Sequence, residues 1–494
     1  MRSGLTTTSL TLAVLLLAGC AANPLRQYDS ELQETVKLVR QGSVKQAVAH
    51  LEQNNEPGVI TKDKDILYYL EKGELLTLDN DHPGAKDAWL KADEVVREWE
   101  DSFKTDPNKL FGDIGSYLVN DKTRRYEGQD YEKVMLSTNL TLSHIMQGNY
   151  DHARVEMKKT YEREKLIESF REQEYDKLQD EGKKQEITAS VKDMKGYPMA
   201  ELDAPEVTDL KNGFQNAFAH YLAGYFFEVT GEPSLAEPGY RNALQLAPKS
   251  KIVQAGLREV GRRKPGAKES DVLFVIESGF APSWKSITIP IPIPREKGRL
   301  VVTPLSFPLL KAESPGFVPP TLKVAGKQLP VETLSNIDFM ARRMLKDQMP
   351  GILLRTVIRA VVKSVAQEQA NKGGVVLGLA ANIASAVSEQ ADDRSWRTLP
   401  ERISIARATL PQGTQSIEFQ TGSGSFKKEV EISQRFTIIP VRLTGGAVYV
   451  GQPNTPGYVA PVVAAPEPEI KPKRPVKKPP VKKPPVKKPE QATQ

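Results

Sequence analysis

The sequence predicts an α+β fold: a helical solenoid, then a small β-sandwich-like domain with a helical insertion, then a disordered tail rich in Lys and Pro. Residues 31–262 carry apolar side chains at helical spacing and few β-rich runs, which indicates an all-α domain. Residues 270–445 hold short alternating apolar runs, and a helical stretch over 333–392 interrupts them. Residues 452–494 are of low complexity and cannot build a core.

The first twenty residues have the layout of a secretion signal. Arg2 gives a positive start, residues 10–18 are apolar, and small residues precede Cys20. The apolar stretch is shorter than the roughly 20 residues that a membrane-spanning helix needs. Residues 1–19 are therefore predicted to be a signal peptide and residues 20–30 a linker.

The end of this segment, Leu17-Ala18-Gly19-Cys20, resembles the lipobox of bacterial lipoproteins. The resemblance implies that a signal peptidase recognises the three small or apolar residues and that Cys20 receives a diacylglyceryl group and an N-acyl chain such as palmitate. Buried acyl chains contribute about 0.8 kcal/mol per CH₂, so they would hold the chain on a membrane. Ala21 lacks the aspartate associated with inner-membrane retention, which implies an outer membrane and a periplasmic location. A Gram-positive surface lipoprotein and an ordinary signal peptide with an unrelated cysteine are the alternatives.

Two stretches of the helical region share one spacing of small and aromatic residues. It matches the tetratricopeptide (TPR) pattern, in which a Gly and two Ala let paired helices approach and an aromatic ring fills the groove between them. Pro238 fits this pattern only in the first turn of its helix. Two degenerate units cover about 31–55 and 134–162. The predicted TPR packing residues are Gly73, Ala85, Trp89 and Ala92 in one unit and Gly224, Ala236, Tyr240, Ala243 and Pro248 in the other.

Residues 162–184 are densely charged and predict a long, solvated helix. Farther on, residues 286–293 alternate and are then interrupted by Pro, which is typical of an edge strand. In the insertion, an apolar helical stripe runs beside a basic one that contains Arg355 and Arg359. The apolar helices at 351–387 have two interpretations: a hairpin buried against the sandwich, or a helix resting on an anionic membrane surface.

Two short segments are candidates for contact with a partner. The first is a polar and aromatic cluster that either lines a ligand surface or orders the loop before a helix. The second places a Trp between two Arg, the residue types that dominate binding hot spots. Its alternative is a Trp that caps the sandwich core while the Arg residues pair with Asp392 and Asp393. The candidate residues are Tyr126, Asp130, Tyr131, Arg394, Trp396 and Arg397.

Catalytic and metal-binding patterns are lacking in the sequence. It contains no nucleotide-binding Gly-rich loop, no H-E-x-x-H and no G-x-S-x-G, and a single Cys excludes thiolate zinc clusters. His144 and His152 are eight residues apart, but the turn Gly148-Asn149-Tyr150 is expected to separate them. We therefore expect no enzyme, no metal and no cofactor besides the lipid. The alternative is an envelope or peptidoglycan-acting enzyme with a cleft between the helical and β domains.

The positive charge of the chain is concentrated in its tail. The net charge is +6, and residues 461–494 account for all of it with nine Lys or Arg and three Glu. A nucleic-acid-binding fold would carry a basic face, so we expect no nucleic acid partner. The tail could make weak, salt-sensitive contacts with peptidoglycan or anionic lipid, which would make the protein a structural tether.

The lipobox, the TPR-like helices with the segment YEGQDYE (126–132), and the segment DRSWRTLP (393–400) together resemble a poorly characterised family of proteobacterial TPR-containing outer-membrane lipoproteins. The resemblance covers roughly 20–445. It implies a lipid-anchored protein that faces the periplasm and brings no established activity. The leading hypothesis is thus a protein-binding scaffold in the cell envelope, with an envelope protein as its partner.

Overall fold

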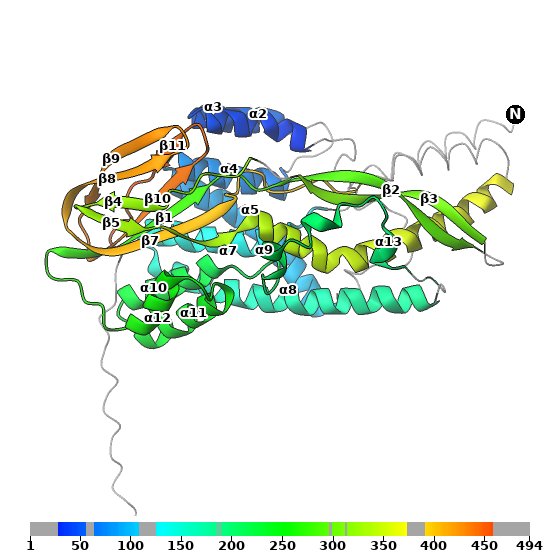
Figure 1. The fold of residues 1–494 in the computed structure, drawn as a ribbon, viewed down its shortest axis with the longest axis horizontal. Coiled ribbons are helices and arrows are strands. Elements are labelled where there is room, and N and C mark those ends of the chain that lie inside the picture. Colours follow the sequence, from blue (N-terminus) through cyan, green and yellow to red (C-terminus); the bar gives the residue numbers. More distant parts are fainter. Residues whose placement is uncertain are drawn as a thin grey trace, which may run out of the picture. The chain divides into compact units, whose positions relative to one another are not determined.

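The structure is a computed structural model that describes residues 28–55, 64–107, 125–184, 187, 189–295, 299–311, 314–372 and 391–457. The chain divides into two units, Met1–Tyr458 and Val459–Gln494, and all described residues belong to the first. The predicted signal peptide with Leu17, Ala18 and Gly19, the lipidation site Cys20, the apolar run 375–387 and the Lys/Pro tail lie outside the described residues. Helices occupy the N-terminal half and sheets the C-terminal part, so the mixed α+β class is confirmed (Figure 1).

Four pairs of helices follow one another along the N-terminal half, and a three-residue connection joins the members of each pair. The pairs are α2 (Tyr28–Arg40) with α3 (Val44–Asn54), α4 (Ile66–Leu78) with α5 (His82–Thr105), α7 (Asp130–Met146) with α8 (Tyr150–Lys184), and α10 (Ala217–Val229) with α11 (Pro233–Leu246). α12 (Lys251–Glu259) follows, and η3 (Val191–Asp193), η4 (Met199–Glu201) and α9 (Pro205–Thr208) are short. Connections this short fold each second helix back along the first.

The same turn closes all four pairs. Its middle residue has a positive φ in every case: 85° at Gly42, 61° at Asn80, 73° at Gly148 and 89° at Gly231. The following N–H donates to the carbonyl five residues back, as from Asn149 to His144 at 2.8 Å. This pattern is the Schellman ending of a helix, in which a left-handed residue lets the chain reverse and satisfies the last carbonyls.

The predicted TPR packing residues meet inside two of these pairs. A Cβ added at Gly73 would lie 2.2 Å from the Trp89 ring, and one added at Gly224 would lie 2.8 Å from the Tyr240 ring. In both pairs the aromatic ring of the second helix therefore lies directly on the glycine of the first. The flanking alanines Ala85, Ala92, Ala236 and Ala243 are fully buried, and Pro248 follows the end of α11. Pro238 lies in the second turn of α11, because the helix begins at Pro233, so the first-turn expectation is wrong.

Two sheets pack face to face in the C-terminal part. The first has the order β11-β10-β1-β7-β6 and the second the order β5-β4-β8-β9. Their strands are β1 (Glu269–Ser278), β6 (Glu332–Asn336), β7 (Arg402–Pro411), β10 (Phe436–Leu443) and β11 (Val448–Val450), and β4 (Thr321–Val324), β5 (Lys327–Pro330), β8 (Gly413–Thr421) and β9 (Gly424–Ile432).

The strand β1 is covered on both of its faces. Val272, Phe274 and Ile276 join the core between the two sheets, whereas Leu273 and Val275 join the core that the first sheet shares with the helices. A strand buried on both faces needs an unbroken apolar run, which explains the sequence VLFVI at 272–276. The sheets thus form a sandwich whose outer side on β1 is packed against the helical part.

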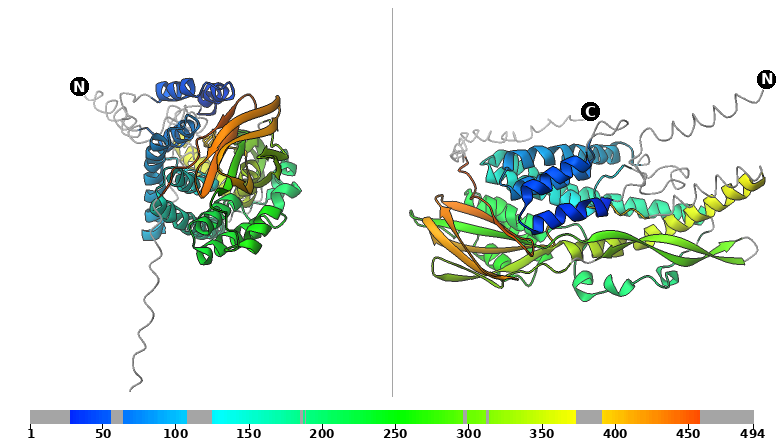
Figure 2. Two further views of the ribbon diagram at one scale, coloured as in Figure 1. Left: turned by 90° about the vertical axis from the view of Figure 1, so that its left-hand side faces the viewer. Right: turned by 90° about the horizontal axis from the view of Figure 1, so that it is seen from above.

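A long two-stranded ribbon, β2 (Ser283–Arg295) with β3 (Arg299–Lys311), runs beside α13 (Ile337–Lys372), as the right-hand view of Figure 2 shows. The ribbon buries Ile289 and Ile291 of β2 and Phe307 of β3. All five prolines of the ribbon lie at every second position of the strands, the even-numbered ones. Pro290 is paired with Pro304, and Pro292, Pro294 and Pro308 lie at the same alternate positions of the register. The helix α13 begins at Ile337, because β6 takes residues 332–336, so the helical stretch starts four residues after the approximate bound predicted for the insertion.

None of the described helices is both long enough and apolar enough to cross a membrane.

Candidate binding site

The segment 392–400, which leads from the insertion into β7, contacts the helices α2, α4, α5 and α7 and is buried from Arg394 onward. The Glu132 carboxylate of α7 accepts a hydrogen bond from the Trp396 N–H at 2.7 Å. The Glu71 carboxylate of α4 accepts from the N–H groups of Arg397 at 2.6 Å and Thr398 at 3.0 Å. Two carboxylates thus satisfy the backbone of an irregular segment that would otherwise be buried without hydrogen-bond partners.

The Trp396 side chain is fully buried and lies edge-on to Trp89 of α5, with the ring centroids 6.3 Å apart. Trp396 belongs to the core that the helices share with the first sheet, not to the core inside the sandwich. The expectation that it caps the sandwich core is therefore wrong. Its ring instead fastens the segment 392–400 to a predicted TPR pair.

Four other candidate partner-binding residues are buried around the segment 392–400: Tyr126, Tyr131, Arg394 and Arg397. Arg394 is bound to Asp392 at 2.6 Å, as expected, whereas Arg397 pairs with Asp29 of α2 at 3.1 Å. The Tyr126 hydroxyl donates to Glu132 at 2.6 Å, and the Tyr131 hydroxyl accepts from the Trp284 ring N–H at 3.3 Å. In this arrangement Tyr126, Tyr131, Arg394, Trp396 and Arg397 cannot form a partner surface, because each is buried by other parts of the chain.

A buried charge cluster adjoins this segment. Nη1 of Arg442 lies 3.5 Å from Glu74 and 3.7 Å from Glu277. Its Nη2 donates to the carbonyls of Gly279 and Thr398 at 2.9 and 2.8 Å. Burial, with the nearby Glu277 adding to it, raises the pKa of Glu74 to about 8, and burial also raises the pKa of Glu277. One arginine thus faces two carboxylates in the interior.

A cavity of about 310 Å³ opens at a different place, between α7, α8, α13 and the loop before α10. We call it the α8–α13 cavity. Its apolar wall combines residues of α8, α13 and the loop, and Gly351 of α13 is among them. The lining residues are Asp130, Glu168, Arg171, Glu174, Tyr175, Leu178, Lys211, Asn212, Gly213, Phe214, Met344, Asp347, Gln348, Gly351, Ile352 and Arg355.

The polar wall of the cavity is a row of alternating charges. Arg171 grips Asp130 with two hydrogen bonds of 2.7 and 2.8 Å and donates a third to Glu174 at 2.7 Å. Arg355 of α13 donates to the other oxygen of Glu174, and Gln348 donates to Asp130 at 3.0 Å. Burial raises the pKa of Glu174, but Arg355 and Arg171 outweigh it and hold the pKa at about 2. Glu174 is therefore ionised at neutral pH.

Asp130 is the only candidate partner-binding residue that lines the cavity. The other polar lining residues are not predicted from the sequence, because Arg171 and Glu174 lie in the stretch 162–184, which is predicted to be solvated. A finer signal was present: Arg171, Tyr175 and Leu178 lie four and three residues apart and share one helix face. A face that mixes an arginine with two large apolar side chains is unusual for a fully solvated helix.

His144 and His152 lie together in the structure. The turn between α7 and α8 folds the chain back, so the His144 and His152 rings stack with their centroids 5.2 Å apart. The expectation that this turn separates them is wrong. Burial and the neighbouring His152 lower the pKa of His144 to about 4. Among the residues that the structure describes, no group of three or more His, Cys, Asp or Glu is arranged to hold a metal.

No protein-family model and no curated protein matches the sequence.

Proposed function

We propose that the chain is a lipid-anchored binding protein of the bacterial cell envelope, a TPR-like scaffold and not an enzyme. In this proposal, Cys20 carries the lipid, and the folded body faces the periplasm from the outer membrane. The four helix pairs with one shared turn, two of them with a ring on a glycine, support the TPR-like part of the proposal.

The observation that carries the binding role is the α8–α13 cavity. The cavity lies between helices of the predicted helical domain and α13 of the insertion in the predicted β domain, so the alternative enzyme could place its cleft there too. It is open, with a volume near the lower end of the range of about 300–1,000 Å³ that is typical of ligand pockets. An envelope protein that inserts one or two side chains would fit it better than a large cofactor.

The charges of the cavity favour recognition over catalysis. A general base must be able to take a proton near neutral pH, and a pKa close to 7 suits that task. The Glu174 pKa of about 2 makes it a poor base, and Asp130 is engaged by Arg171 and Gln348. Carboxylates held by arginines are well suited to orient a ligand.

Photo-crosslinking in living cells tests this proposal. Benzoylphenylalanine would replace Tyr175, which is 40% exposed at the cavity, or Tyr161, which is 50% exposed elsewhere on α8. We expect a reproducible crosslink to one envelope protein from position 175 that is absent from position 161. The same products from both positions, or none from either, would remove the support for a scaffold.

The matched control changes Gly351, which lies on α13 across the cavity from Tyr175 of α8. Gly351→Leu would fill the cavity, because a Cβ at Gly351 makes only ordinary contacts, 3.4 Å from Leu178 and 3.7 Å from Tyr175. The crosslink from position 175 should disappear in this variant while the protein level stays the same. A crosslink that persists would show that the partner binds outside the cavity.

A further inference from the structure

We infer that the outer face of the β2–β3 ribbon rests on the lipid bilayer that holds the acyl chains of Cys20. This inference rests on the proposed lipid anchor and adds a second, non-covalent contact with the same membrane. Three features carry it: an exposed apolar face, polar groups that already have partners, and the short chain between the anchor and the ribbon. The outer face consists of even-numbered positions of both strands, among them Ser286, Thr288, Pro290, Pro292, Val302, Pro304, Ser306 and Pro308.

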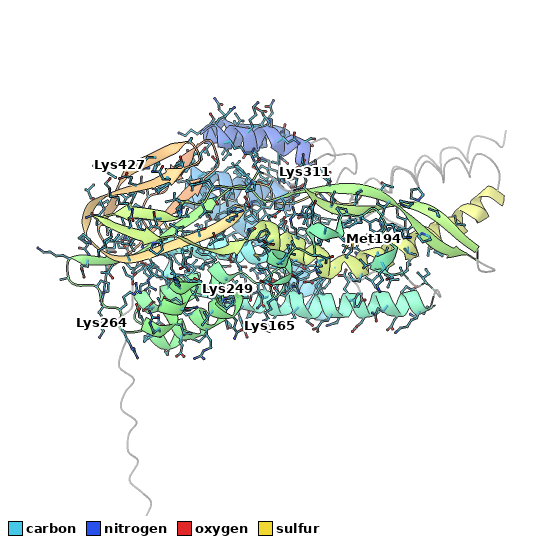
Figure 3. The ribbon with its side chains drawn as sticks, viewed as in Figure 1. Lys165, Met194, Lys249, Lys264, Lys311 and Lys427 are labelled. Carbon is cyan, nitrogen blue, oxygen red and sulfur yellow. The ribbon has the colours of Figure 1, made fainter. Side chains whose placement is uncertain are left out.

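The inner face of the ribbon is covered by the protein itself. Ile289 and Ile291 of β2 and Phe307 of β3 are buried in the core that the first sheet shares with the helices. Met194, labelled beside the ribbon in Figure 3, belongs to the same core, and the Tyr197 hydroxyl donates to the Pro308 carbonyl at 2.7 Å. The folded chain therefore accounts for the apolar residues at the odd-numbered positions.

The outer face is also apolar, although it is exposed. A sheet with one face in water normally alternates apolar and polar side chains. Here Pro290, Pro292 and Pro304 are exposed, and Val302 is 64% exposed. Neither strand carries a charged residue over 286–294 or over 300–310. A contiguous exposed apolar patch of this kind is typical of a contact site.

The polar groups of the outer face have partners within the protein. The hydroxyls of Thr288 and Ser306 lie 3.0 Å apart and share a hydrogen bond, and the Ser286 hydroxyl accepts from the Ala391 N–H at 3.2 Å. The five prolines have no N–H to direct away from the partner strand. Polar groups without partners are costly in lipid, so a face that has few of them can leave water readily.

The chain between the anchor and the fold is short. Residues 21–27 separate Cys20 from Tyr28, the first residue of α2. An extended chain spans at most about 3.6 Å per residue, so Cys20 lies within about 30 Å of Tyr28. The next residue, Asp29, pairs with Lys285 at the beginning of β2, 2.6 Å away. The anchor therefore holds this end of the ribbon close to the bilayer.

The charges at the ends of the ribbon favour a bilayer over an apolar protein segment. Lys311, which Figure 3 labels, is exposed where β3 ends beside the start of β2. At the other end, residues 295–299 include three basic residues and one Glu. Basic residues that flank an apolar stretch are suited to anionic lipid headgroups. A cover made of apolar residues, such as the segment 375–387, would leave these cations without a role.

Fluorescence quenching tests the inference on the full lipidated chain. Val302→Cys is labelled with the thiol-reactive fluorophore NBD, which reaches only this thiol because the lipid blocks Cys20. The protein is placed in vesicles of phosphatidylethanolamine and phosphatidylglycerol, about three to one, that contain a lipid with a doxyl quencher on its acyl chain. Val155→Cys on α8 is the matched control, since Val155 is 58% exposed outside the ribbon. We expect the quencher to lower the emission about twofold at position 302, as for a residue at the acyl boundary, and to leave position 155 unchanged.

A second pair of variants separates charge from the loss of a proline. Pro292 is paired with Val302 across the two strands, and both are exposed. Pro292→Asp places a carboxylate beside the label and should reduce the quenching to that of position 155. Pro292→Ala adds the same N–H without the charge and should keep most of the quenching. Because position 292 is exposed, neither variant should change the melting temperature.

Quenching at position 302 that does not exceed that at position 155 would overturn the inference. A blue-shifted emission at position 302 that the doxyl lipid leaves unquenched would overturn it in favour of a protein cover. Loss of that blue shift on dilution to one chain per vesicle would identify the cover as a second copy, and its persistence would identify the segment 375–387.

The wild-type protein distinguishes this failure from a failure of the proposed function. It should take up no NBD, because its single thiol carries the lipid. Wild-type protein that does take up the label would remove the proposed anchor. Unlabelled wild-type protein together with an unquenched position 302 would leave the anchor in place, and only the contact of the ribbon would be wrong.

Discussion

The buried cluster of Glu74, Arg442 and Glu277 makes stability fall as the pH rises. The pKa of Glu74 is about 8 in the folded protein, compared with 4.5 for the free side chain. The folded state therefore binds more protons than the unfolded state between about pH 4.5 and pH 8. Wherever the folded state holds the extra proton, the free energy of unfolding decreases with increasing pH.

Glu74→Gln removes this titration while keeping the size of the side chain and an acceptor for Asn139, which donates to Glu74 at 3.3 Å. A shift from 4.5 to about 8 corresponds, at about 1.4 kcal/mol per unit, to as much as about 5 kcal/mol. We expect the variant and the wild type to be similar near pH 5. At pH 9 the variant should be more stable by a few kcal/mol.

Urea unfolding at pH 5, 7 and 9, followed by tryptophan fluorescence, measures the difference. Glu52→Gln is the control, because Lys64, Lys72 and Tyr68 outweigh the effect of burial and lower the pKa of Glu52 to about 2. A lowered pKa stabilises above 4.5 and loses its effect only as the pH falls toward 2, so this variant should show no added slope between pH 5 and 9. Parallel pH profiles for Glu74→Gln and the wild type would refute the reasoning.

Three further changes have expected outcomes. Trp396→Ala removes the ring that fastens the segment 392–400 and should lower the free energy of unfolding by about 3–5 kcal/mol in a denaturant titration. Gly73→Ala places a Cβ 2.2 Å from the Trp89 ring, which should cost about 1–3 kcal/mol by the same assay, whereas Gly351→Ala should be neutral or stabilising. Cys20→Ala should move the protein from the membrane fraction to the soluble fraction after cell lysis, and retention in membranes would contradict the proposed anchor.

The helix pairs were predictable because the signal for them is local. Gly73 and Trp89 lie 16 residues apart, and so do Gly224 and Tyr240, within one pair of helices each. Because the aromatic ring on the second helix packs against a glycine on the first, the number of residues between the two is the same in both pairs. The β-type runs and the break at the insertion were visible for a similar reason, since alternation follows directly from the geometry of a strand.

The roles of the candidate residues were not predictable, because they depend on contacts between distant parts of the chain. Glu71 binds the backbone of Arg397, and Glu132 binds that of Trp396, more than 250 residues away in both cases. A Trp flanked by two Arg looks the same in the sequence whether it is exposed in a binding hot spot or buried in the core. The α8–α13 cavity draws its walls from α7, α8, α13 and a loop, so no single stretch contains its signal.

The prolines of the β2–β3 ribbon have a consequence for how the protein behaves among its neighbours. A proline is tolerated in a strand where its missing N–H would have pointed away from the partner strand. The prolines at alternate positions of β2 and β3 therefore remove hydrogen-bond donors from the outer edges of the ribbon. An extended ribbon with free margins would otherwise invite a third strand from another molecule. Many copies of the protein can therefore be present at high concentration without their ribbons pairing into fibres.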